Sequence, residues 1–251
     1  MFILDGILWL LILLGPLLIL QRSLHRETQA IFLLLTRRAE IALALFSLLF
    51  FPGVLLHETS HYLMARLLGV RTGRFSLLPQ KMANGRLQLG FVETAPADWV
   101  RDGLVGVAPL LLGGVFVAYA GLSRLGLTVL WDRFVTAGPA ASLQALPDLH
   151  VQPDFWLWFY LVFVVSSTML PSPSDRRAWL PLVLVASLLL GLSLLAGAGP
   201  WLLLYLAPPL NQAMQAVAVV FGISVFIHLV LVVPVWGVRQ LLSRITGWDV
   251  V

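Results

Sequence analysis

The residues best suited to do chemistry form the sequence His57-Glu58-Thr59-Ser60-His61, which lies inside a long apolar run. On a helix, His57 and His61 would be one turn apart on the same face, where they can bind one Zn²⁺. Glu58 would lie beside the metal, able to take a proton from a water molecule and pass it to a leaving amine. Ionisable side chains are costly at membrane depth unless they have a partner or a function. The pattern therefore favours a metalloprotease site over two ordinary polar residues and an unrelated glutamate.

The composition of the chain is that of a membrane protein. Of its 251 residues, 59% are hydrophobic and only 11% are charged, which lies far outside the range of soluble globular proteins. There is no cysteine, so disulfides, cysteine-ligated zinc and a thiol nucleophile are excluded. The net charge of +4 comes from basic residues that flank apolar runs and form no stripe. This distribution argues against a nucleic-acid partner.

The apolar runs predict an all-α polytopic membrane protein of about six transmembrane helices. The expected spans cover approximately residues 1–20, 41–68, 103–122, 155–171, 179–206 and 212–238. We expect three regions: 1–40, with an N-terminal transmembrane helix and an interfacial segment; 41–177, the metalloprotease core; and 178–251, with two C-terminal transmembrane helices.

The segment directly after the histidine-bearing span is expected to form a small β-hairpin. Residues 74–78 and 86–92 alternate partly between apolar and polar side chains, and Ala83-Asn84-Gly85 between them is typical of a hairpin turn. An ordinary polar loop is the alternative. An extended substrate would pair with the edge of such a hairpin. The candidate substrate-binding residues there are Arg86, Leu87, Gln88 and Leu89.

A catalytic zinc site usually has three protein ligands, so the two histidines need a partner. Asp175 is the leading candidate, because it closes a proline-rich turn, Pro171-Ser-Pro-Ser-Asp175, at the end of an apolar span. The two prolines stop the helix and stiffen the backbone that carries the carboxylate. His228 in the last expected span is an alternative ligand, although its position also suits a packed histidine. Glu93 would be the third ligand in another class of membrane zincin.

On these residues the chain resembles the site-2 protease family of intramembrane zinc metalloproteases, as a divergent member. The resemblance covers residues from about 41 to 177 and rests on three features: H-E-T-S-H at 57–61 in a transmembrane span, the hairpin-like stretch after it, and L-P-S-P-S-D at 170–175. It implies zinc held by His57, His61 and Asp175, with Glu58 as the general base. It also implies a re-entrant hairpin that binds the substrate strand and cleavage of membrane-embedded peptides.

Three features depart from the family pattern. Ser174-Asp175-Arg176 stands where the family often has Leu-Asp-Gly, and the distance from Pro171 to Asp175 is one residue shorter. Thr168 replaces the Asn that is common three residues before the first proline. Thr168 is therefore a further candidate substrate-binding residue.

The sequence thus predicts a zinc-dependent intramembrane endopeptidase whose partners are the lipid bilayer and a membrane-embedded protein or peptide. The alternative is a non-proteolytic membrane protein that binds a metal for transport or structure. A transporter should carry ionisable residues on several spans, whereas apart from the motif and His228 these spans are nearly free of them. Lys81 is the only lysine, and all other basic residues of the Lys/Arg type are arginine. This preference for arginine suggests a GC-rich prokaryotic genome, so we expect a prokaryotic cell membrane. The distribution of arginine favours an active site nearer the cytoplasmic face.

Overall fold

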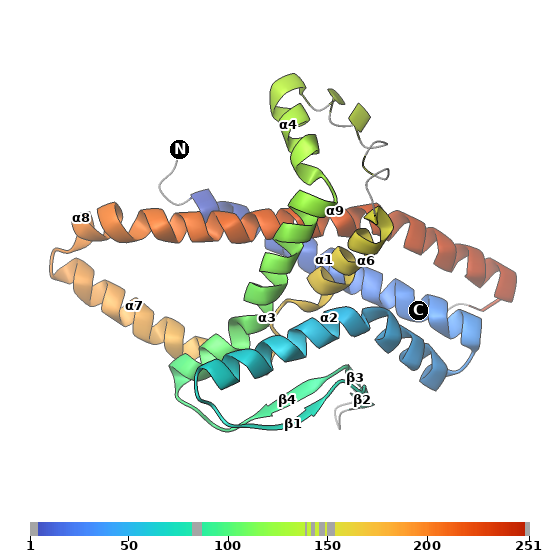
Figure 1. The fold of residues 1–251 in the computed structure, drawn as a ribbon, viewed down its shortest axis with the longest axis horizontal. Helices are drawn as coiled ribbons and strands as arrows, with labels where there is room; N and C mark the ends of the chain where they lie inside the picture. Colours follow the sequence, from blue (N-terminus) through green and yellow to red (C-terminus); the bar gives the residue numbers. More distant parts are fainter. Residues whose placement is uncertain are drawn as a thin grey trace.

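The computed structural model describes residues 5–81, 87–138, 140–141, 144–145, 149 and 154–248. Within these residues, four helical stretches are long and apolar enough to cross a membrane, which fits a membrane protein (Figure 1). They are α1 (Asp5–Thr36), α2 (Ala39–Leu67), α3 (Trp99–Tyr119) with its continuation η1 (Ala120–Arg124), and the unit made of α8 (Gly199–Trp201), η2 (Leu202–Leu206) and α9 (Ala207–Thr246). The remaining helices are α4 (Leu127–Ala137), α6 (Phe155–Thr168) and α7 (Trp179–Leu195).

The expected number of about six spans is therefore corrected to four among the described residues. α6 has 14 residues and α7 has 17. At about 1.5 Å per residue these helices are roughly 21 and 26 Å long, shorter than the hydrocarbon core of about 30 Å. Pro171 and Pro173 prevent α6 from continuing, because a proline lacks the N–H that the helix needs. Gly197 follows α7 with a φ of 78°, a left-handed conformation that commonly ends a helix.

The interfacial segment expected within residues 1–40 is continuous with the first expected span, because α1 is one unbroken helix of 32 residues. The buried Glu27 in the second half of α1 forms an ion pair with Arg239 of α9, with 2.6 Å between the carboxylate oxygen and Nε. A paired carboxylate can remain among apolar helices. The polar residues after residue 20 therefore do not end the helix, and α1 packs mainly against α9.

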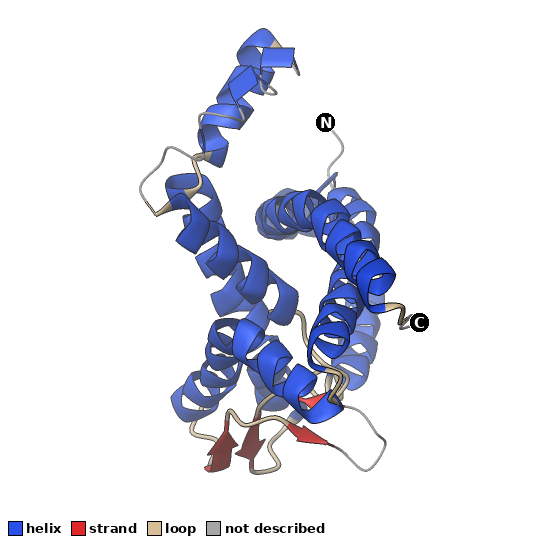
Figure 2. Cartoon of the chain, turned by 90° about the vertical axis from the view of Figure 1, so that its right-hand side faces the viewer, coloured by secondary structure: helices blue, strands red, loops and turns tan. Residues whose placement is uncertain are grey.

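The expected hairpin follows α2 directly. β1 (Thr72–Ser76) pairs antiparallel with β4 (Phe91–Thr94), and β2 (Gln80–Lys81) pairs antiparallel with β3 (Leu87–Gln88). The expected turn Ala83-Asn84-Gly85 lies outside the described residues. The strands lie at one end of the helical bundle (Figure 2). Because α2 contacts both β1 and β4, the hairpin lies beside the helix that carries the histidines.

Close contact between α2 and α6 organises the core around the site. Gly53 of α2 has no room for a side chain, because a Cβ there would overlap the Val164 carbonyl and the Thr168 hydroxyl of α6. Small residues permit such approach of two helix backbones. Buried side chains of both helices surround the contact, among them Phe50 and Val162. The contact brings the end of α6 against the turn of α2 that carries His57.

Candidate metal centre

Three residues singled out from the sequence, His57, His61 and Asp175, come together in the structure. Each offers a ligand atom, and these atoms all lie within 4.8 Å of one another. The two histidine Nε2 atoms are 3.2 Å apart. Asp175 lies in the turn between α6 and α7, with Oδ1 at 3.3 Å from His61 Nε2 and Oδ2 at 3.7 Å from His57 Nε2. The side chains of two residues one helical turn apart and of a third in a proline-rich turn thus converge on one point.

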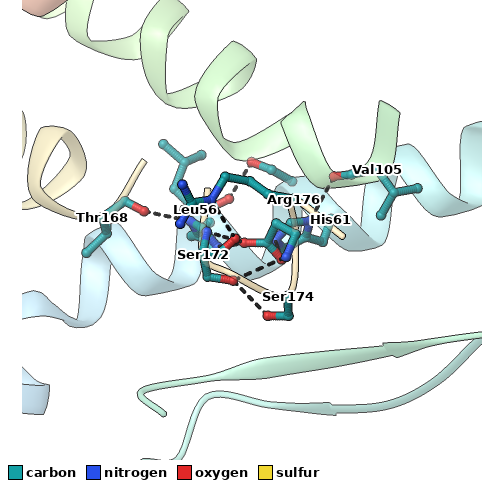
Figure 3. Close-up of polar contacts among 10 residues, drawn as sticks. Leu56, His61, Val105, Thr168, Ser172, Ser174 and Arg176 are labelled. Carbon is teal, nitrogen blue, oxygen red and sulfur yellow. Dashed lines mark hydrogen bonds and ion pairs between the residues drawn. The ribbon is translucent and has the colours of Figure 1, made fainter. Parts of the chain in front are cut away.

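Backbone carbonyls orient both imidazole rings (Figure 3). His57 Nδ1 lies 2.6 Å from the carbonyl oxygen of Thr168, the last residue of α6, and His61 Nδ1 lies 2.8 Å from the carbonyl oxygen of Val105 in α3. A carbonyl oxygen can only accept, so each Nδ1 carries a proton and donates it. In the neutral rings both Nε2 atoms are left with a lone pair. Those lone pairs are directed to the point that Asp175 also faces.

The spacing of these donors suits a metal ion. The two Nε2 atoms are 3.2 Å apart. Asp175 faces each histidine with a different oxygen, Oδ1 at 3.3 Å from His61 and Oδ2 at 3.7 Å from His57, and one ligand atom from each of the three residues lies within 4.8 Å of the others. Two nitrogen lone pairs and a carboxylate that face one another repel unless a cation or a proton lies between them. The group can therefore hold a metal ion, and three protein ligands leave a fourth position open for water or substrate.

The turn that carries Asp175 is held by its own hydrogen bonds. The backbone N–H of Ser172 donates to Asp175 Oδ2 over 2.7 Å, and the backbone N–H of Asp175 lies 3.4 Å from Ser172 Oγ. These two bonds fix the orientation of the Asp175 carboxylate within the turn.

Helix α3 supports this turn from the other side. Gly106 has no room for a Cβ, which would overlap the backbone carbonyl oxygen of Asp175. Arg177, two residues beyond the ligand, forms an ion pair with Asp102 of α3 at 3.2 Å. The same helix orients His61 through the carbonyl of Val105. Two successive residues of α3 thus position two different ligands, one by a hydrogen bond and one by the absence of a side chain.

Glu58 lines the same cavity as the three residues that could hold a metal, but it is not one of that group. It is buried, with 8% of its surface exposed. A helix turns by about 100° per residue, so Glu58 is directed to one side of His57. Gly90, just before β4, packs on it, and a Cβ at Gly90 would lie 2.9 Å from Glu58 Cγ. No group in the described part of the chain is hydrogen-bonded to the Glu58 carboxylate, which leaves it available to a proton.

The cavity in front of the ligands has a volume of about 610 Å³. Its walls come from α1, α2, the start of α3, the end of α6, the Asp175 turn and the strand side of the fold. The strand side contributes the stretch from Leu89 to Val92 together with Thr94. An extended stretch beside the ligands offers a peptide substrate a surface of matching shape.

The other candidate substrate-binding residues have different positions. Thr168 lines the cavity, but its hydroxyl donates to the Val164 carbonyl over 3.0 Å within its own helix. Its backbone carbonyl, which holds His57, is the part that serves the site. Leu87 and Gln88 form β3, of which only the backbone is described, and Arg86 lies outside the described residues. Of the four hairpin candidates, Leu89 is the one that the structure places at the cavity.

Neither alternative third ligand joins the group. His228 is fully buried in α9, with Nδ1 at 2.7 Å from the Ser224 carbonyl oxygen and Nε2 at 3.0 Å from Ser167 Oγ. Glu93 lies in β4 and forms an ion pair with Arg74 at 3.2 Å on the exposed side of the hairpin. Asp175 is thus the acidic residue that meets the two histidines.

Sequence reasoning missed four residues that shape the site. Val105 acts through its carbonyl, so its side chain gives no signal, whereas Gly106 is one of the small residues of an apolar helix and could have been noticed. Ser172 stands three residues before Asp175, a spacing typical of a side chain that caps a turn. His25 of α1 also lines the cavity, and its ring packs edge-on against Phe50 with 4.7 Å between centroids. Nothing in the sequence around His25 indicates this position.

Comparisons of the chain with protein-family models, with curated proteins and with solved structures found no match. The resemblance to the site-2 proteases therefore rests on the histidine motif, the hairpin and the Asp175 turn. A function has to be argued from the geometry of the site itself.

Proposed function

We propose that this protein is a zinc-dependent intramembrane endopeptidase, a divergent member of the site-2 protease family that cleaves peptide bonds of membrane-embedded substrates. One observation carries the proposal: His57, His61 and Asp175 converge in a cavity that Glu58 also lines. The four apolar helices of spanning length support a location in the bilayer. A cavity with three ligands and an unpaired carboxylate has the parts that metal-assisted peptide hydrolysis requires.

Zinc is the metal that suits this donor set. Two imidazoles and one carboxylate that converge on one point are typical of catalytic zinc. When bound there, zinc would polarise the scissile carbonyl and make a water molecule at the open position more acidic. The carbonyls of Thr168 and Val105 would assist metal binding without contacting the metal. They accept the Nδ1 protons of the two histidines, which fixes the ring tautomers and raises the basicity of the Nε2 atoms.

Glu58 is the general base of the proposed reaction. Its carboxylate takes a proton from the attacking water and returns it to the nitrogen of the leaving amine. A carboxylate already paired with a cation or with several donors would be a weaker base. The absence of a hydrogen bond from the described residues and the burial beside the ligands both suit this role.

The strand side of the cavity is the proposed substrate site. A peptide bond can be hydrolysed only when the chain around it is extended and accessible, so a helical substrate must first unwind. Strand β4 (Phe91–Thr94) borders the cavity, and its main-chain groups could hold an unwound segment by strand pairing. This arrangement would place a substrate carbonyl within reach of both the metal and Glu58.

Metal analysis combined with a cleavage assay tests the proposal. The purified protein is expected to bind one zinc ion per chain and to cleave a peptide embedded in detergent micelles or liposomes. A chelator should abolish cleavage and added zinc should restore it. Stoichiometric metal without cleavage of any membrane-embedded peptide would favour the non-proteolytic alternative. A protein that binds no zinc even after loading would contradict the proposal.

A further inference from the structure

The last turn of α6 is connected by side chains to three other helices. The final carbonyls of a helix have no partner inside it and need one elsewhere. Here the Ser167 carbonyl accepts a hydrogen bond from the Gln21 amide of α1, and the Thr168 carbonyl accepts one from His57 of α2. The Ser167 hydroxyl lies 3.0 Å from His228 Nε2 of α9. The helix end next to the proposed metal is thus attached to α1, α2 and α9 together.

The direction of the bond between Ser167 and His228 is fixed by its surroundings. His228 is completely buried, which favours the neutral imidazole. Its Nδ1 lies 2.7 Å from the Ser224 carbonyl oxygen and must donate to it, so in the neutral ring Nε2 accepts and the Ser167 hydroxyl donates. Ser167 is 1% exposed, so both partners are buried. Buried polar groups that lose a partner are costly. The pair therefore favours one position of the α6 end relative to α9.

We infer that Gln21, Ser167 and His228 are positioning residues for the metal centre. By holding the end of α6, they keep the Thr168 carbonyl in line with His57 Nδ1. That hydrogen bond maintains the His57 tautomer whose Nε2 is free to bind a metal. The inference rests on the proposed function, and it extends the centre to α1 and α9, two helices that contribute no ligand.

Ser166 offers a matched control within the same helix. It is fully buried like Ser167, but its hydroxyl lies 3.1 Å from the Phe163 carbonyl oxygen of its own helix. The two neighbouring serines are equal in size and nearly equal in burial. They differ in their hydroxyl contacts, because the Ser167 hydroxyl bonds to His228 of α9 and the Ser166 hydroxyl bonds within α6. A general contribution of a buried hydroxyl to packing should be similar at both positions.

The experiment compares Ser167→Ala with Ser166→Ala in the purified protein. Zinc affinity is measured by competition with a chelator, the melting temperature on the metal-free protein, and the His57 tautomer from nitrogen-15 NMR of histidine-labelled, metal-free protein. Loss of a direct partner of a ligating histidine lowers metal affinity about 10–100-fold, so a loss one bond further away should lower it about 3–10-fold. Ser167→Ala should show that loss and a changed His57 tautomer, whereas Ser166→Ala should retain wild-type values.

Further variants separate the positioning role from packing. Gln21→Met, which keeps the side-chain length but lacks the donor, should lower zinc affinity in the same way. Adding His228→Phe to Ser167→Ala should cause little further loss, because both changes remove the same bond. Equal zinc affinity and an equal His57 tautomer in the two serine variants would overturn the inference, as would equal losses that follow equal falls in melting temperature. If wild-type protein binds no zinc, the proposed function fails. The positioning role is then tested by the His57 tautomer: a change confined to Ser167→Ala supports it, and no change overturns it.

Discussion

Helices α6 and α7 follow each other on either side of the Asp175 turn, and both are strongly apolar, but they are placed very differently. Six of the 14 residues of α6 are buried, whereas none of the 17 residues of α7 is. Figure 1 shows α7 extending away from the bundle, while α6 lies within it. The serines mark the difference: Ser167 at the end of α6 is hydrogen-bonded to two other helices, whereas the Ser193 hydroxyl of α7 donates to the Leu189 carbonyl of its own helix. Apolarity alone therefore does not distinguish a helix that packs on protein from one whose surface is left to lipid.

The largest effect is expected at the turn where the two helices meet. Asp175→Asn removes the charge of the third ligand and should lower zinc affinity by about 100-fold or more, since losing a ligand costs more than losing one of its outer partners. Asp154→Asn is the matched control, because Asp154 is exposed at the other end of α6 and makes no capping hydrogen bond. Competition with a chelator measures both affinities. Unchanged zinc affinity in Asp175→Asn would remove this residue from the site.

A smaller effect is expected where α3 supports the turn. Gly106→Ala forces the Asp175 backbone to move, and overpacking of this kind costs about 1–3 kcal/mol; we expect zinc affinity to fall about tenfold. Gly191→Ala in α7 is the control, because no neighbouring atom lies within 4 Å of the Cβ it would add. Its zinc affinity and melting temperature should stay at or slightly above wild type, since alanine favours a helix more than glycine does. Equal zinc affinities in the two variants would show that the close contact at Gly106 does not position Asp175.

The smallest effect is expected on the free energy of unfolding, when one valine is shortened in each of the two helices. Val162 in α6 is fully buried and Val183 in α7 is 59% exposed. Val162→Ala should lower the free energy of unfolding by about 1–3 kcal/mol, because it leaves a cavity in the core. Val183→Ala should change it by less than about 0.5 kcal/mol. Thermal unfolding in one detergent measures both, and an equal loss of stability would mean that α7 is packed against protein after all.

The same contrast explains which parts of the fold could be predicted from the sequence. The spans at α2 and α3, the hairpin and its place after α2 all follow from local patterns: apolar length, alternation and turn residues. Six spans were expected because α6 and α7 are as apolar as the four helices of spanning length, and their lengths of 14 and 17 residues became clear only in the structure. The continuation of α1 beyond residue 20 has a long-range cause that local patterns do not show. Glu27 finds its partner Arg239 more than two hundred residues away.

For the candidate site, the ligands were predictable and their supports were not. His57 and His61 follow from a spacing of four residues, and Asp175 from the proline-rich turn that carries it. The carbonyls of Thr168 and Val105 could not be found in this way, since every residue has a carbonyl and only the packing of α2 against α6 and α3 decides which one faces a histidine. His228 shows the same limit, because only the structure reveals that Ser167 and Ser224 occupy both ring nitrogens.

Glu58→Gln tests whether Glu58 acts as a base beside a metal that it does not bind. The glutamine keeps the size of the side chain but cannot accept the proton of the attacking water. Zinc content and melting temperature should remain close to wild type, while cleavage of a membrane-embedded peptide should fall by roughly two orders of magnitude or more, the scale of lost general acid–base catalysis. Wild-type cleavage by the purified variant, or loss of its zinc, would contradict the account.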